Sequence, residues 1–545
     1  MKKRTLWIAA SLVAVLLGGG ALTLFLVGQR YVRNFEPRIK QALTEYLEKR
    51  FESEVELKDL RVHIGRVPPI SAVWNKGRGV GAVVEASGLV MRQKGRRDIP
   101  PMFAIRLVRC EFDLGTLLDS PRSVPTVFLD GMEINVPPKG DRPSLAQRTG
   151  GEQGTAVVIG KIFVHGAKLT LLPKPSAKRR PLLFEIMEME LQDAGPGQAM
   201  HYKAELINPR PKGLINSEGT FGPWDAEEPG ASPLNGTYIF RNADLGIFRG
   251  IAGILNSTGR FHGELSSVTA TGSASVPDFR LKRAGQAVPL VTQFEVEVDG
   301  TNGNTTLKPV YATLGSTKFV TEGTVIKHET GQPRAIDLIA DMPAGDMRDI
   351  MRLAMKGAPM MEGTIKLHTK IEIPPLSGKV REKLILDGKF VIDQGRFTKD
   401  AVQDKVDELS RRGQGQPKNL EISDTFSAMK GEFHMEDEAI MFRALQFAVP
   451  GAQVKLTGNY DMDADQLNFL GTLALDAKVS QTLTGWKRWL AKPIDPLFAK
   501  NGSGTYLGVT VNGSAKKPAF GASRNTKAAE EAFAAAASGA PLAKQ

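Results

Sequence analysis

The stretch "LNFLGTLALDAKV" (residues 467–479) alternates apolar and polar side chains almost without interruption. The apolar residues share one parity: Leu467, Phe469, Leu473, Leu475, Ala477 and Val479. The other parity is polar: Asn468, Thr472, Asp476 and Lys478. Because successive side chains of a β-strand point to opposite faces of its sheet, this stretch predicts a strand with one apolar face and one wet face.

The same period of two recurs along the chain, for example in "QFEVEVDG" (293–300) and "GTIKLHTKIEI" (363–373). Antiparallel sheets show this alternation, whereas strands of parallel sheets covered by helices read as continuous apolar runs. The 56 glycines and 33 prolines in 545 residues favour many short elements joined by turns. We therefore expect a mainly β protein with a few helices, built as an elongated, curved antiparallel sheet, a β-groove.

The N-terminus carries a targeting signal. A basic start (residues 1–4), expected to be cytoplasmic, precedes an uncharged run at 5–29 whose apolar part would extend about 33 Å as a helix. We expect an uncleaved transmembrane anchor at 5–29; a cleavable signal peptide is the alternative. Since basic residues stay on the cytoplasmic side, a bacterial chain of this kind would be a single-pass inner-membrane protein with its bulk in the periplasm.

Helical spacing is rare. An amphipathic helix is expected at 36–51, packed on the first strands or, alternatively, lying on a membrane surface. The remaining helical patterns fall at 244–255, 345–357 and 399–413, with a fourth within "VSQTLTGWKRWLAK" (479–492). The alanine-rich end (522–545) is expected to be a disordered tail or a weak helix.

Motifs for chemistry are nearly absent. Seven scattered histidines form no HxH or HExxH grouping, and a single Cys110 allows no internal disulfide. "HMEDE" (434–438) fits a solvated hairpin turn better than a cation site, and "GRGVGA" (77–82) fits a loop better than a dinucleotide fingerprint. "SAMK" (427–430) matches the Ser-x-x-Lys of acyl-serine enzymes in only two positions. We expect no enzyme, no catalytic residue, no metal and no cofactor; the net charge of +12 is diffuse, and no nucleic-acid partner is expected.

An apolar sheet face must be covered by a second sheet, by helices, by closure into a barrel or by a ligand. β-Sandwiches with dry cores would show the same pattern, so alternation alone leaves both interpretations open. A lipid with roughly 30 chain methylenes costs about 24 kcal/mol to expose to water, which makes lipid tails a natural occupant. The candidate groove-lining residues are Phe294, Val296, Val298, Ile365, Leu367, Ile371, Ile373, Leu467, Phe469, Leu473, Leu475, Leu507, Val509 and Val511.

Longer stretches carry a family resemblance. These are "NADLGIFRGIAGILNSTGRFHGELSSVTATGSASVPDF", "LDGKFVIDQGRFTKDAVQDKVDELSRRGQGQP" and "LALDAKVSQTLTGWKRWLAKPIDPLFAKNGSGTYLGVTVNG". Residues 235–521 resemble the C-terminal region of the bacterial AsmA-like family of envelope proteins, which are related to TamB. Residues 52–234 are similar to it only in layout, as the N-terminal part of the same β-groove.

The resemblance implies a function. Proteins of this family are anchored in the inner membrane, and the implied role is envelope biogenesis: carrying phospholipid or a similar amphiphile along the β-groove toward the outer membrane. The implied partners are that amphiphile, the inner membrane and outer-membrane assembly proteins. The alternative is a scaffold that assists outer-membrane protein assembly. The resemblance brings no catalytic residues with it.

Overall fold

The structure of the chain is a computed structural model. It describes residues 53–537 except for 66–77, 137–156, 173–180 and gaps of at most five residues, together with eight helical residues between 37 and 48. Strand residues make up 62% and helical residues 16%, so the chain is mainly β as predicted. Twenty-three strands are assigned to one sheet, and β10 (Ile251–Ala252) with β13 (Arg280–Leu281) form a separate ribbon.

The chain divides into two compact units. Unit 1 comprises Met1–Ile247, Leu255–Ala274 and Val296–Asn304, and unit 2 comprises Phe248–Ile254, Ser275–Glu295 and Thr305–Gln545. Each unit contains its own ladder of paired strands.

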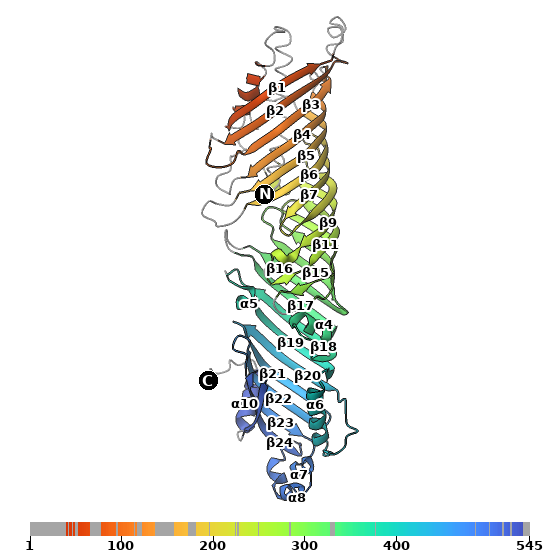
Figure 1. Cartoon of the computed structure of the whole chain (residues 1–545), viewed down its shortest axis with the longest axis vertical. Coiled ribbons are helices and arrows are strands. Elements are labelled where there is room, and N and C mark those ends of the chain that lie inside the picture. Colours follow the sequence, from red (N-terminus) through yellow and green to blue (C-terminus); the bar gives the residue numbers. More distant parts are fainter. Residues whose placement is uncertain are drawn as a thin grey trace. The chain divides into compact units, whose positions relative to one another are not determined.

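Unit 1 contains the strands β1 to β9, followed by β11 and β12 (Figure 1). Their bounds are β1 Ser53–Ile64, β2 Gly81–Gln93, β3 Phe103–Asp113, β4 Arg122–Val136, β5 Val157–Leu171, β6 Leu182–Ala194, β7 Met200–Pro209, β8 Lys212–Phe221, β9 Pro233–Asp244, β11 Ile254–Glu264 and β12 Ser267–Val276. From β1 to β9 each strand pairs with the next one along the chain.

One pair corrects the prediction of an antiparallel sheet: β4 and β5 run parallel, with Val127 opposite Ile162. A parallel pair needs a crossover connection of about a dozen residues or more. The 20 residues 137–156 between these strands are long enough for one. The other neighbouring pairs from β1 to β9 are antiparallel.

The inward side chains of unit 1 are deeply buried. Ile105, Val127 and Ile162 are each at most 1% exposed and belong to one large apolar cluster. The described helical residues between 37 and 48 add Leu43 and Leu47 to that cluster, at 3% and 0% exposed. Of the two interpretations of the helix at 36–51, these contacts favour packing on the first strands.

Unit 2 contains an uninterrupted antiparallel ladder from β15 to β25, and β14 (Leu290–Val298) falls across the division between the units. The strand bounds are β15 Thr305–Leu314, β16 Thr317–Ile326, β17 Ala335–Asp346, β18 Met361–Ile373, β19 Ile385–Phe397, β20 Ser427–Glu436, β21 Ala439–Val449, β22 Ala452–Asp461, β23 Gln466–Leu475, β24 Thr505–Ser514 and β25 Lys517–Ser523.

The helices of unit 2 lie mainly in connections between strands (Figure 1). Their bounds are α4 Met347–Ala354, α5 Val380–Lys383, α6 Asp400–Gly413, α7 Val479–Thr482, α8 Lys487–Ala491, η5 Lys492–Ile494, α9 Asp495–Phe498 and α10 Thr526–Ala537. Within the alanine-rich end, expected to be a disordered tail or a weak helix, α10 forms a helix with Ala529 fully buried, which corrects the alternative of a tail disordered throughout.

The helix predicted at 244–255 is wrong. Only the short 3₁₀ turn η4 (Leu245–Ile247) forms there, followed by β10 and the start of β11. Gly250 and Gly253 have φ values of 93° and 138°, which a right-handed helix does not permit. The apolar residues of this stretch matched helical spacing by coincidence.

The predicted anchor at 5–29 lies outside the described residues. Among the residues that are described, no helix is long and apolar enough to cross a membrane.

Candidate functional site

The strands β17 to β24 of unit 2 place apolar side chains opposite one another in four rows, which together we call the apolar face. The first row joins Ile365, Ile392, Met429, Phe447, Val454, Leu473 and Leu507. The second joins Met342, Leu367, Phe390, Gly431, Leu445, Leu456, Gly471 and Val509. The third joins Ala340, Thr369, Gly388, Phe433, Phe442, Gly458, Phe469 and Val511. The fourth joins Leu338, Ile371, Leu386, Met435, Ile440, Tyr460, Leu467 and Gly513.

Nine of the fourteen sequence candidates belong to these rows, on β18, β23 and β24. Ile373 and Leu475 have the same parity and lie two residues beyond Ile371 and Leu473, next to the rows. Phe294, Val296 and Val298 do not join these rows, because they lie on β14. Reasoning from the sequence missed the middle of the face, including Phe390, Phe433, Phe442, Leu445 and Leu456, although the alternation in "LDGKFVID" (386–393) is a signal that could have found part of it.

The apolar face is not sealed. Of these nine candidates and their neighbours Ile373 and Leu475, only Ile365, Phe469 and Leu475 are buried, at 5% to 7% exposed, and the other eight are half-buried. Side chains that lie between two packed sheets are excluded from water. They would be as fully buried as the inward residues of unit 1. Half-burial is what cross-strand neighbours alone give to a side chain on an uncovered sheet.

Aromatic rings at the centre of the face lie against glycines. Phe433 is opposite Gly388 and Phe390 is opposite Gly431, and the two ring centroids are 6.3 Å apart. An added Cβ at Gly388 would meet the Phe433 ring at 2.7 Å. Because glycine has no side chain, it leaves room for the phenylalanine ring of the neighbouring strand.

Two helices pack on one margin of the face. α4 contributes Met347, Ile350 and Met351 to a cluster with Ile365 and Ile392 of the first row. α6 contributes Val406 and Leu409 to a cluster that includes Phe447, Leu473 and Leu475. The cluster with α4 also includes Met342, Leu367 and Phe390 of the second row, whereas neither cluster includes a residue of the third or fourth row.

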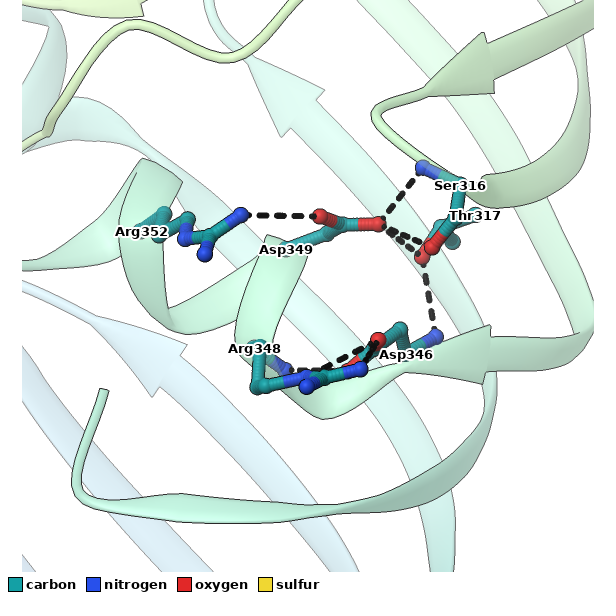
Figure 2. A network of polar contacts seen from close by, with 6 residues as sticks. All are labelled: Ser316, Thr317, Asp346, Arg348, Asp349 and Arg352. Atoms are coloured by element: carbon teal, nitrogen blue, oxygen red, sulfur yellow. Dashed lines mark hydrogen bonds and ion pairs between the residues drawn. The ribbon is translucent and has the colours of Figure 1, made fainter. Parts of the chain in front are cut away.

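A buried aspartate fixes α4, and Figure 2 shows its contacts. Asp349, 4% exposed, accepts hydrogen bonds from the Ser316 amide and hydroxyl, both at 2.8 Å, and from the Thr317 hydroxyl at 3.1 Å. Arg352 lies 3.9 Å from the same carboxylate. At the start of the helix, Asp346 accepts from the Arg348 amide, and the Arg348 guanidinium beside it lowers the pKa of Asp346. α4 is therefore tied to the turn between β15 and β16.

α6 is also held by hydrogen bonds to a buried aspartate. Asp407, also 4% exposed, accepts from the Thr425 amide at 2.9 Å, the Asp424 amide at 3.1 Å and the Gln403 side chain at 3.0 Å. Burial alone would raise the pKa of Asp407, but these hydrogen bonds outweigh it and the pKa is lowered. Near the end of the helix the Ser410 hydroxyl donates to the Pro450 carbonyl at 2.9 Å.

α10 lies over the opposite face of the sheet. Its Phe533 ring is 6.0 Å from the Lys455 ammonium, and its Glu530 interacts with Tyr506. Lys455 has the opposite parity to Val454 and Leu456 on β22, so it points away from the apolar face. α10 therefore covers the polar side and leaves the apolar face uncovered.

Two of the sequence motifs considered for chemistry make structural contacts. Ser427 is 3% exposed and donates to the Gly395 carbonyl at 2.9 Å, while Lys430, three residues along β20, is exposed on the other face. In "HMEDE", Asp437 and Glu438 form the β20–β21 turn with φ of 48° and 62°. No group of three or more metal-ligating side chains is present in the described part of the chain.

Unit 1 has a hollow of its own, of about 760 Å³, on β4 to β9. Phe128 and Phe163 stack at 5.3 Å there, beside carboxylates that include Glu188, Glu205 and Glu218. None of the fourteen sequence candidates lines it.

No family model matches the sequence, and a search of the curated proteins found no match.

Proposed function

We propose that this chain holds phospholipid, or a similar amphiphile, by its acyl chains on the apolar face of unit 2. In this proposal the anchor at 5–29 attaches the chain to a bacterial inner membrane, the bulk of the chain lies in the periplasm, and the lipid passes along a β-groove toward the outer membrane. The resemblance of residues 235–521 to AsmA-like envelope proteins supports the same function.

The observation that carries the proposal is a broad apolar face most of whose side chains stay half-buried. At a strand spacing of about 4.8 Å, eight neighbouring strands extend over about 34 Å, and four rows of alternate residues extend over about 20 Å. Soluble monomers rarely leave an apolar area of this size open to water. Because each buried methylene contributes about 0.8 kcal/mol, acyl chains would gain from lying there.

Photocrosslinking of the full-length protein in its native membranes tests the proposal. A photoreactive residue at Leu456, in the second row, should form adducts with lipid. The matched control is Gln453 on the same strand, which is exposed and has the opposite parity. Lipid adducts at Leu456 and none at Gln453 support the proposal, and protein adducts alone at Leu456 would overturn it.

A second candidate function has one observation in its favour. β25 is exposed along nearly its whole length and pairs only with β24 among the described strands, with Phe520 at 75% exposed. An open strand edge can add a strand of another protein, as a scaffold for outer-membrane protein assembly would. A photoreactive residue at Ala519 on β25 would then form protein adducts while Leu456 formed no lipid adduct.

A further inference from the structure

The connection between β23 and β24, residues 478–500, exposes large apolar side chains, and we call it the helical tip. It consists of α7, α8, η5 and α9, and α7 and α8 project beyond β24 in unit 2 (Figure 1). Its apolar side chains are Leu497 at 80% exposed, Trp489 at 70%, Leu490 at 65% and Ile494 at 39%. Few other positions of the described chain place exposed residues of this size so close in sequence.

The helical tip is strongly basic. Between 478 and 500 there are five basic residues and one acidic residue, giving a net charge of +4. Lys487, Arg488 and Lys492 are exposed beside Trp489, and the Lys492 ammonium lies 4.1 Å from the centre of the Trp489 ring. The single acidic residue, Asp495, bonds to Ser480 within the tip, and its charge is included in the net +4. Since Lys500 pairs with Glu530 of α10, the exposed positive charge beside Trp489 comes from Lys487, Arg488 and Lys492.

The base of the helical tip is firmly held, so the exposure of its apolar side chains does not come from a loose loop. Asp495 accepts from the Ser480 amide at 2.8 Å and from the Ser480 hydroxyl at 2.7 Å. Arg412 of α6 donates to the Thr482 carbonyl at 3.2 Å, and the Thr505 hydroxyl of β24 donates to the Ala477 carbonyl at 2.7 Å. A fixed base therefore presents the exposed apolar side chains outward.

We propose that the helical tip docks on the surface of an anionic lipid bilayer. Tryptophan with neighbouring aliphatic side chains favours the boundary between headgroups and acyl chains, and flanking Lys and Arg are attracted by anionic headgroups. The net charge of +4 is complementary to such a surface and repels basic partners. This inference does not depend on lipid being carried on the apolar face.

A fluorophore on the helical tip tests this inference in the full-length protein. Cys110 is 2% exposed, so Leu490→Cys or Leu497→Cys gives a single reactive thiol for an environment-sensitive label such as NBD. The protein is held in phosphatidylcholine nanodiscs and mixed with vesicles of phosphatidylcholine with or without phosphatidylglycerol. The emission should shift to shorter wavelength with the anionic vesicles. The shift should decline when the salt rises from about 0.1 M to about 1 M, because the Debye length falls from about 10 Å to about 3 Å.

A label at Leu420→Cys is the matched control, because Leu420 is 78% exposed but lies outside the tip. Replacing Trp489 and Leu497 by serine should weaken binding of anionic vesicles roughly tenfold or more, since apolar insertion adds to the electrostatic attraction. The same exchange at Leu420 and Leu376, the latter 60% exposed, should leave binding unchanged. Labels that stay in water at both tip positions, or equal binding of neutral and anionic vesicles, would overturn the inference. A label on the tip whose emission shifts only when another protein is added would also overturn the inference.

Discussion

The ring of Phe433 lies directly across the β19–β20 ladder from Gly388, where a Cβ on the glycine would meet the ring at 2.7 Å and the His368 carbonyl at 2.8 Å. Gly388→Ala would therefore displace the ring or the backbone. Overpacking of this kind costs about 1–3 kcal/mol. We expect the midpoint of denaturant unfolding to fall accordingly.

Gly357→Ala is the control for that substitution, because nothing lies within 4 Å of a Cβ built at Gly357. This variant should unfold like the wild type. Equal stability of the two alanine variants would show that the centre of the apolar face is loosely packed, contrary to the contact described.

Removal of the carboxylate of Asp407 should loosen α6. Asp407→Ala leaves the Thr425 and Asp424 amides and the Gln403 side chain without their acceptor. Losing hydrogen bonds to a buried charge should cost about 3 kcal/mol, measured as faster hydrogen exchange in α6 and a lower unfolding midpoint. Glu408→Ala, which removes an exposed pair with Arg412, should change stability by less than about 0.5 kcal/mol.

Because Asp407 is ionised in the folded protein, its contribution to the free energy of unfolding should depend on pH. The pKa of Asp407 is lowered in the folded state, so its contribution is complete above the unfolded value of about 3.9 and is lost as the pH falls below it. The stability difference between the wild type and Asp407→Asn should therefore hold steady from about pH 6 to about pH 5 and narrow as the pH falls from about 5 to about 3. A difference that stays constant over this range, measured by urea unfolding, would contradict the hydrogen-bonded ionised carboxylate.

The sequence predicted the parity of the strands but not what covers their faces. The alternation at 363–373 and 467–475 placed Ile371 and Leu467 on one face, and the register joins them in the fourth row. Similar alternation occurs in unit 1, where Val127 is fully buried. Whether an apolar strand face is buried depends on segments distant along the chain. The alternation within one strand could therefore not distinguish the half-buried face of unit 2 from the buried face of unit 1. The sequence could not predict the parallel pairing of β4 with β5 either, because the residues of a strand do not show which strand it pairs with or in which direction.

Cys110 should be inert in the folded protein. It is 2% exposed on β3, and burial raises the pKa of its thiol far above the ordinary value. Because the thiolate is the reactive form, a thiol reagent at neutral pH should modify Cys110 only when unit 1 opens. The modification rate should rise steeply across the unfolding transition. Rapid labelling in native conditions would show that β3 opens locally.

Charge placed on the apolar face should separate lipid binding from stability. Leu456→Lys puts an ammonium in the second row, between Leu445 and Gly471, where acyl chains would otherwise lie. Leu456 is half-buried, so the lysine can extend its charge to water, and the unfolding midpoint should change little. Phospholipid that co-purifies with the full-length protein should fall severalfold, because a charge on the face disfavours apolar chains. Gln453→Lys adds the same group on the other side of β22 and should leave lipid unchanged. Undiminished lipid in Leu456→Lys would place the lipid elsewhere on the chain.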